Sequence, residues 1–297
     1  MDNIELIRYR RALKRKNYSA HTLKSYLNIL DHFRRWITVP IVEVTSKEAG
    51  LYVDHLLQKR RTPKTITCHL QAIRLFFDYL IQEEAIPIVN PVTRISIRLP
   101  KPLPRHLKDD QVTRLLAVIT DVRDRAMFML MLRCGLRVQE VADLTLDAVD
   151  WHRRQIFVSK GKGSKDRIVY VSEDARSALW AYVSKRSAKG KRLFLVQKGP
   201  MRGQPLSVRG IQKRIEYYAK ESRLNVSCHR LRHTMATQLL NADAGLATIQ
   251  DLLGHGQITT TQRYCWVANL KVQRDYYKAM ELVLQRTQAQ GENDDGE

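Results

Sequence analysis

Residues 155–172 read QIFVSKGKGSKDRIVYVS, with apolar alternation on both sides of a glycine-containing turn. This pattern predicts a β-hairpin. Before and after it, the apolar residues mostly recur at the three- and four-residue spacing of amphipathic helices. We therefore expect a mainly α-helical fold with a small antiparallel β-sheet.

The helices expected around the hairpin come first at about 108–119 and 123–134. Gly135 ends the second of these, and the next begins within LRVQEVADL, residues 136–144. From about residue 173 the pattern is mainly helical, and residues 270–285 predict an amphipathic helix. Residues 286–297 form an acidic tail that we expect to be disordered.

The N-terminal part is also helical by pattern. From Ser19, apolar residues follow a helical period, and Thr45 with Glu48 predicts a capping box at the start of the next helix. Thr62 is the expected N-cap of a third helix, with Pro63 at its first position. These signals predict a helical unit over residues 1–90.

A proline-rich segment divides the chain, since five of its nine prolines lie between residues 87 and 104. Proline at this density stiffens an extended connection and cannot continue a helix. We expect a basic linker at 91–104 and a second domain at 105–285, which makes two domains with separate cores.

The charge balance is the strongest compositional signal. The 297 residues include 51 Lys plus Arg against 30 Asp plus Glu, a net charge of +21. Such an excess favours a polyanionic partner, either nucleic acid or an acidic membrane surface. The longest strongly apolar run, MFMLML at 127–132, is too short to span a bilayer, and the N-terminus lacks a signal-peptide pattern.

The four cysteines, Cys68, Cys134, Cys228 and Cys265, are scattered without a CxxC pair or zinc spacing. They are typical of reduced thiols, so we expect an intracellular nucleic-acid-binding protein. Basic residues of the N-terminal helices are candidates for the phosphate backbone, the alternative being a solvated helix face. They are Lys24, Arg34, Arg35, Arg60, Arg61, Lys64 and Arg74.

Two basic positions in the second domain suit phosphate chemistry. Arg137 begins a helix after a glycine, where its guanidinium fork and the helix amides can hold a phosphate. The hairpin turn presents Lys160, Lys162, Lys165 and Arg167, and a lysine at such a tip can protonate a leaving alkoxide. The turn lacks P-loop spacing, and its alternative is a solvated loop.

HRLRHTMATQLL, residues 229–240, places His229, Arg232 and His233 on one helical face. A metal site is disfavoured because Arg230 stands where HExxH has its glutamate and Arg232 would repel a cation. A phosphate held by histidine and arginine suits the charge better. The plain alternative for His233 is a structural residue.

LLGHGQITTTQRY, residues 252–264, has Gly254 and Gly256 around His255, which predicts a helix end and a turn. The TTTQRY segment then predicts a short helix presenting Tyr264. Its phenol becomes a nucleophile only where positive charge and hydrogen bonds favour the phenolate. The alternative is a buried aromatic residue, and Cys265 is expected to be a packing residue.

Taken in order, the motifs are GLRxxE, GKGxKxR, HxLRH, LLGH and a tyrosine nine residues after His255. This set resembles the catalytic domain of the tyrosine recombinases, the lambda-integrase family, and most of all its Xer-type members. The N-terminal half is similar to that family's SAM-like core-binding domain. The resemblance implies a two-domain DNA clamp.

The resemblance also implies roles for individual residues. Arg137 and Arg232 would clamp the scissile phosphate, and His255 would hydrogen-bond it. Lys162 would be the general acid, His229 would assist proton transfer, and Tyr264 would be the nucleophile. Lys160 and Lys165 would contact DNA beside Lys162.

The reaction implied is site-specific DNA recombination through a 3′-phosphotyrosine and a Holliday junction, without metal, cofactor or ATP. It would serve integration, excision or resolution of DNA in a prokaryotic cytoplasm, on the nucleoid. The implied partners are double-stranded DNA and three further copies of the chain in a synaptic tetramer. The protein would be a monomer in solution, and in the tetramer each C-terminal helix would dock on a neighbour. Accessory proteins are left unspecified.

Two alternatives compete with this interpretation. A type IB topoisomerase shares the chemistry, and a non-catalytic DNA-binding accessory protein would share the fold. The compact helical N-terminal domain and the HxLRH and LLGH spacing favour a recombinase over the first. The intact set of six catalytic residues favours an enzyme over the second.

Overall fold

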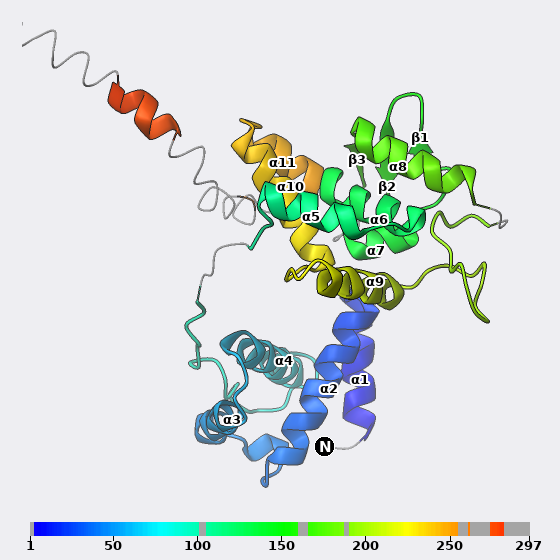
Figure 1. Ribbon diagram of the computed structural model, residues 1–297. Helices are drawn as coiled ribbons and strands as arrows, with labels where there is room; N and C mark the ends of the chain where they lie inside the picture. Colours follow the sequence, from blue (N-terminus) through cyan, green and yellow to red (C-terminus); the bar gives the residue numbers. More distant parts are fainter. Residues whose placement is uncertain are drawn as a thin grey trace, which may run out of the picture. The chain divides into compact units, whose positions relative to one another are not determined.

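The computed structural model describes residues 3–100, 105–159, 166–186, 190–254, 261 and 274–281. The chain forms two compact units, Met1–Pro102 and Leu103–Glu297. Both are mainly helical, and a small antiparallel sheet belongs to the second (Figure 1). The predicted fold class is therefore confirmed. Within the described residues, no helix is long and apolar enough to cross a membrane.

The first unit consists of α1 (Asn3–Arg15), α2 (Ala20–Trp36), a 3₁₀ turn (Ile41–Glu43), α3 (Ser46–Gln58) and α4 (Pro63–Gln82). The predicted helix starts are confirmed. Ser19 and Thr62 cap α2 and α4 with their side chains, and Thr45 forms a capping box with Glu48, whose carboxylate accepts from the Thr45 N–H at 2.9 Å.

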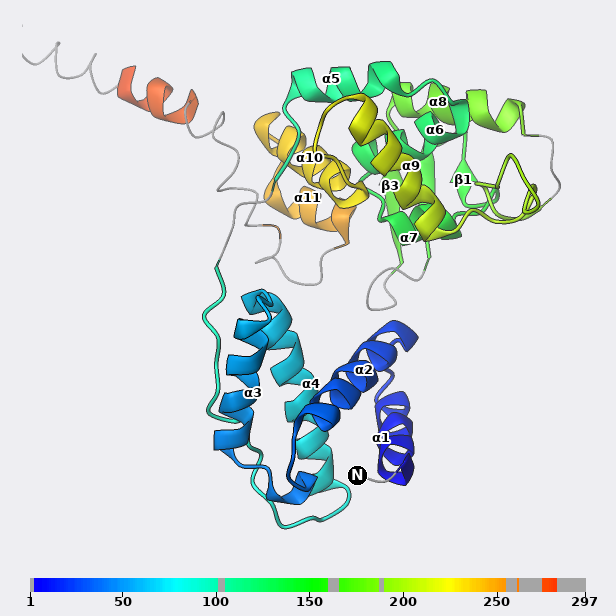
Figure 2. The ribbon, with the colours of Figure 1, turned by 60° about the horizontal axis from the view of Figure 1, so that its bottom comes forward.

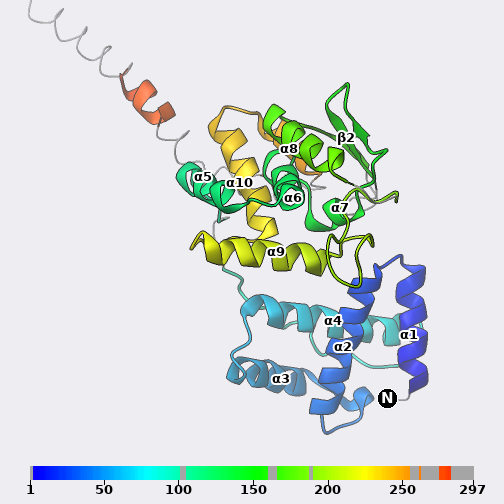
Figure 3. The same cartoon turned by 45° about the vertical axis from the view of Figure 1, so that its right-hand side comes forward.

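Helix α2 packs against both α1 and α4 (Figure 3). The predicted apolar face of α4 is buried, from Ile66 through Phe77 to Leu80. The sequence predicts no bounds for α1, because arginines and lysines surround its short apolar face, in which Tyr9 and Leu13 are buried.

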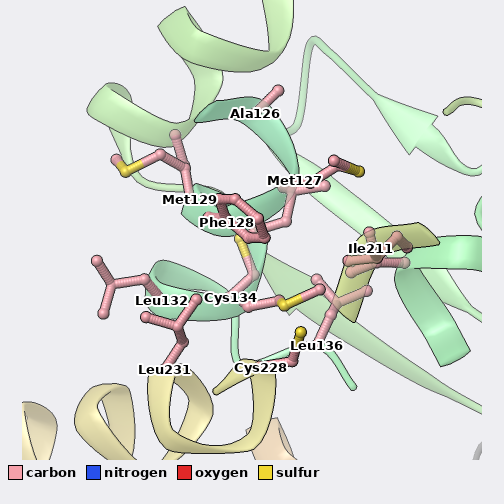
Figure 4. Close-up of a cluster of buried hydrophobic side chains, with 14 of the residues drawn as sticks. Ala126, Met127, Phe128, Met129, Leu132, Cys134, Leu136, Ile211, Cys228 and Leu231 are labelled. Atoms are coloured by element: carbon pink, nitrogen blue, oxygen red, sulfur yellow. The ribbon is translucent and has the colours of Figure 1, made fainter. Parts of the chain in front are cut away.

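The helices of the second unit are α5 (Asp109–Val118), α6 (Val122–Arg133), α7 (Val138–Asp143), α8 (Glu173–Ser184), α9 (Val208–Glu221), α10 (Cys228–Asn241) and α11 (Leu246–Leu253). They bury a large apolar cluster around α6 and a smaller one between α10 and α11. Residues 274–281 are also helical. Helix α6 is buried on nearly every side and contacts both α8 and α10. Figure 4 shows its apolar side chains beside Ile211 of α9 and Leu231 of α10.

The hairpin is formed by β2 (Gln155–Val158) and β3 (Arg167–Tyr170), which pair antiparallel from Gln155↔Tyr170 to Val158↔Arg167. A short strand that the sequence did not predict, β1 (Val149–Asp150), extends the sheet in the order β1-β2-β3 (Figure 1). Figure 2 shows β1 and β3 from another side. The inward residues Ile156 and Val169 are buried, as the alternation predicts.

The expectation of a mainly helical chain after residue 173 holds for α8 to α11 but is wrong for residues 190–207. That segment is irregular and carries two isolated bridges, Thr145↔Arg192 and Leu195↔Pro205. Three glycines and two prolines in 190–205 oppose regular helix.

Candidate active site

Arg137 is held at the junction between α6 and α7. Gly135 has a φ of +66°, and a Cβ there would meet Leu253 Cδ2 at 3.1 Å and Met235 Sδ at 3.2 Å. The turn therefore needs glycine, because it adopts a left-handed conformation and packs tightly on α10 and α11. Arg137 follows as the N-cap of α7, as predicted, although α7 has only six residues.

A buried carboxylate, Glu140, lies between two arginines. It accepts from Arg137 Nη1 at 2.8 Å and from the Arg137 N–H at 2.7 Å. Both Nη atoms of Arg167 donate to the same carboxylate at 2.8 and 2.7 Å, a bidentate pair whose side chains are 8% and 6% exposed. Burial alone would raise the pKa of Glu140, but these hydrogen bonds and the charge of Arg167 lower it to about 2.

Three consecutive carbonyls at the end of α11 each accept from one arginine. Arg167 Nε donates to Leu252 O at 2.9 Å, Arg232 Nη2 to Leu253 O, and Arg137 Nη2 to Gly254 O at 3.2 Å. The last carbonyls of a helix have no partner within it and carry partial negative charge. These carbonyls therefore bind arginines from the start of α7, from β3 and from α10, and they lie directly before His255 in the chain. We call Arg137, Arg167, Arg232 and Glu140 the arginine cluster.

Arg232 is the most enclosed member, with 1% of its surface exposed. Its Nη1 donates to Gly135 O and so joins α10 to the turn before Arg137. Among the described contacts the cluster sets three guanidiniums against one carboxylate and about half a charge from the helix end. Such an excess of positive charge suits an anion, and the planar forks match phosphate geometry.

The predicted histidine and arginine face lies on α10. His229 is exposed and His233 half-buried, and their rings lie 4.2 Å apart between centroids at 73°. Arg232 is on the same helix, three residues after His229 and one before His233. Among the described residues no group of three His, Cys, Asp or Glu side chains is arranged to hold a metal ion.

Five predicted site residues lie outside the described part of the chain: Lys160, Lys162, Lys165, His255 and Tyr264. Gly256, Cys265 and the acidic tail lie outside it as well. The described neighbours that bracket them are Ser159 and Asp166 around the hairpin turn, Gly254 before His255, and Thr261, which is helical and buried. The catalytic roles therefore stay predictions.

Most predicted DNA contacts of the first unit are exposed, namely Lys24, Arg34, Arg35, Arg60, Arg61 and Lys64. Arg34 and Arg35 both pair with Asp31, at 3.3 and 2.7 Å. Arg74 is different, because it is half-buried and donates to Val92 O at 3.0 Å. That bond gives Arg74 a structural task in holding the segment after α4, while DNA contact by any of these residues stays a prediction.

Glu140 and Arg167 are the members of the cluster to which the sequence analysis gave no role. Glu140 stands three residues after the N-cap, a position where glutamate often caps a helix, and this signal was available. Nothing local indicated that Arg167 would reach across 27 residues to the same carboxylate.

Glu140→Gln is expected to lower stability in a pH-dependent manner. The native carboxyl has a pKa of about 2 against an ordinary value of 4.5, so its stabilisation is complete above about pH 4.5 and is lost as the pH falls towards about 2. The difference corresponds to about 3 kcal/mol at neutral pH. Urea titrations of both proteins at a series of pH values would measure it.

The control for this prediction is Glu173→Gln, since Glu173 forms an exposed pair with Arg176. Its cost should stay below about 1 kcal/mol. The free energies of unfolding of wild type and Glu140→Gln should differ less at about pH 3 than at about pH 6. An equal difference at both pH values would show that the ionised state assigned to Glu140 is wrong.

The chain matches two protein-family models. Residues 105–270 match the phage integrase family, and residues 6–86 match the phage integrase N-terminal SAM-like domain. Tyrosine recombinase XerD of Pseudomonas putida is 34% identical over 277 residues, covering 87% of this chain and 91% of the relative. Tyrosine recombinase XerA of Thermococcus kodakarensis is 31% identical over 271 residues, covering 90% and 92%.

Solved structures agree in fold. The Tn1549 transposon integrase, in complex with a circular intermediate DNA, has a TM-score of 0.74 at 22% identity and covers 88% of this chain and 94% of its own. The crystal structure of XerA recombinase has a TM-score of 0.54 at 26% identity, covering 93% and 98%. A lambda integrase dimer bound to a COC′ core site has a TM-score of 0.73 at 18% identity, covering 89% and 94%.

The chain belongs to the phage integrase family, whose two-domain fold it shares. Within that family it is a Xer-like tyrosine recombinase, an enzyme of site-specific DNA recombination. The resemblance found in its sequence is thereby confirmed, and neither the topoisomerase nor the non-catalytic alternative is favoured.

Proposed function

We propose that this recombinase binds a specific site in double-stranded DNA and holds the scissile phosphate at its arginine cluster. The observation that carries the proposal is the convergence of Arg137, Arg167 and Arg232 on the last carbonyls of α11. His255 follows those carbonyls immediately, and Tyr264 follows nine residues later. The solved Tn1549 integrase, which shares the fold, is itself in complex with DNA.

The proposed reaction begins with attack of the Tyr264 phenolic oxygen on the scissile phosphorus. Deprotonating a phenol of ordinary pKa at neutral pH costs about 4 kcal/mol, and His229 takes up the proton. Arg137 and Arg232 clamp the phosphate oxygens while negative charge builds in the transition state, and His255 adds a hydrogen bond. Lys162 protonates the 5′-oxygen as the bond from phosphorus to that oxygen breaks.

The product is a 3′-phosphotyrosine and a free 5′-hydroxyl. Because the phosphodiester energy is kept in the protein–DNA bond, attack by the 5′-hydroxyl of a second duplex rejoins the strands without ATP. Two rounds of exchange, linked by a Holliday junction, recombine two sites. The steps need only the residues named, so we propose that the reaction uses no cofactor and no metal ion.

The proposed assembly on DNA is a clamp of the two domains, with limits 1–90 and 105–285 and a linker at 91–104. Four such protomers join two sites, and the protein free in solution is a monomer. Tyr276 and Tyr277, on the helix at 274–281, are 57% and 61% exposed, which supports docking of this helix on a neighbouring copy. We place the reaction on the nucleoid of a prokaryotic cell, in integration, excision or resolution.

The test compares two supercoiled plasmids after the bound sequence has been selected from a random duplex library. We expect recombined products from a plasmid with two copies of the site, in EDTA and without ATP. A plasmid without the site should stay supercoiled. Efficient relaxation of the site-free plasmid, with no recombination of the other, would instead indicate a type IB topoisomerase.

A further inference from the structure

Arg167 lies at the start of β3, immediately after the hairpin turn that carries Lys162. All three of its guanidinium nitrogens are engaged. The two Nη atoms bind the oxygens of Glu140, and Nε binds the carbonyl of Leu252. Its side chain is 8% exposed, so this geometry is enclosed by the fold.

We propose that Arg167 is a positioning residue that orients Arg137 through their shared carboxylate, Glu140, and ties the base of the hairpin to the end of α11. The inference rests on the proposed function, since it assigns Arg167 a task in holding the phosphate-binding group. Arg167 itself need not touch the DNA.

The shared carboxylate gives the physical reason. Glu140 divides its charge between two guanidiniums, so Arg137 keeps positive charge for a phosphate instead of being neutralised by a private ion pair. Without Arg167, the buried carboxylate would have Arg137 as its remaining ionic partner in the cluster. The existing ion pair between Arg137 and Glu140 would then strengthen, and Arg137 would be less available to the scissile phosphate.

Gly254 gives independent evidence that the position of Arg167 is fixed. A Cβ on Gly254 would lie 3.0 Å from Arg167 Cδ and 3.3 Å from its Nη1, and Gly254 has a φ of +58°. The arginine thus packs directly on the backbone at the helix end. Two of the predicted catalytic residues are close to Arg167 in the sequence or next to a residue that it contacts. Lys162 precedes Arg167 by five positions, and His255 directly follows Gly254.

The test measures single-turnover cleavage of a nicked suicide substrate by the full chain carrying Arg167→Lys, which keeps the charge and loses the fork. We expect cleavage to slow by about 100-fold. The dissociation constant for the intact site, measured in a Tyr264→Phe background, should change by less than about threefold, because most binding energy comes from other phosphate contacts. Rates are normalised to the fraction of folded protein that binds DNA.

The matched control is Arg123→Lys, because buried Arg123 also donates from two guanidinium nitrogens, Nε and Nη2, to a buried carboxylate, that of Asp124. The control should cleave at a rate within about twofold of wild type. Its lost ion pair is buried but does not involve Arg137, so it should not affect the chemical step. The double variant Arg167→Lys with Glu140→Gln should cleave no more slowly than the slower single variant, since the two residues act as one unit.

Cleavage at the wild-type rate by folded Arg167→Lys would overturn the inference. So would a decrease in the cleavage rate of the double variant equal to the product of the decreases in the two single variants. A fall in cleavage with a matching fall in site affinity would also overturn it, since Arg167 would then act by binding DNA. If the wild-type chain itself formed no covalent adduct, the proposed function would fail, and this outcome is distinct from all three.

Discussion

Tyr264→Phe is expected to abolish the covalent adduct between protein and DNA. Phenylalanine keeps the ring and removes the only oxygen that can attack phosphorus, so adduct formation should fall by at least about 10⁴-fold. Binding to the site should be unchanged, because the ring and the basic surface remain. The measurement is denaturing gel electrophoresis of a nicked suicide substrate, in which the covalent species migrates slowly.

Tyr170→Phe is the matched control for that prediction, because Tyr170 is an exposed tyrosine of the same unit to which no role is assigned. Its adduct should form at the wild-type rate. EDTA should have no effect on either protein. Persistence of the adduct in Tyr264→Phe would contradict the nucleophile assignment, and its loss in EDTA would point to a metal ion.

Arg232→Lys is expected to have the second largest effect, on chemistry and on stability together. The Arg232 guanidinium bridges Gly135 O and Leu253 O in the interior, and an ammonium cannot reproduce that planar fork. We expect cleavage to fall by about 10²- to 10³-fold. At least one buried carbonyl loses its donor, so the free energy of unfolding should fall by about 2 kcal/mol.

The control for this substitution is Arg230→Lys, two positions earlier on α10. Arg230 is half-buried and also donates to carbonyls, with Nη2 3.0 Å from His106 O. It should lose stability but cleave within about twofold of wild type once corrected for the folded fraction. Equal cleavage rates in the two lysine variants would show that Arg232 has no special relation to the phosphate.

Local signals in the sequence predicted the local parts of the fold. Thr45 and Glu48 form their capping box, Thr62 and Pro63 begin α4, and the alternation around the hairpin turn gives β2 and β3. Each of these features depends on residues within a few positions of one another. The face shared by His229 and Arg232 was predictable for the same reason, because helix geometry fixes it.

The parts that the sequence did not predict depend on distant contacts. Arg137 meets Gly254 across 117 positions, and Arg167 meets Leu252 across 85. Arg74 appeared equivalent to the exposed basic residues around it, until the fold placed carbonyls of the following segment against its guanidinium. Whether an arginine faces solvent, a carboxylate or a helix end is decided by tertiary packing, which spacing along the chain does not encode.

We expect Tyr264 to become joined to the 3′-phosphate of DNA. Mass spectrometry of the trapped adduct, after nuclease and trypsin digestion, tests it most directly. The tryptic peptide 264–271, YCWVANLK, contains a single tyrosine, so a nucleotide attached to it identifies the residue. We predict that Tyr264 carries the nucleotide through its phenolic oxygen. A nucleotide on any other residue, with peptide 264–271 unmodified, would contradict the account.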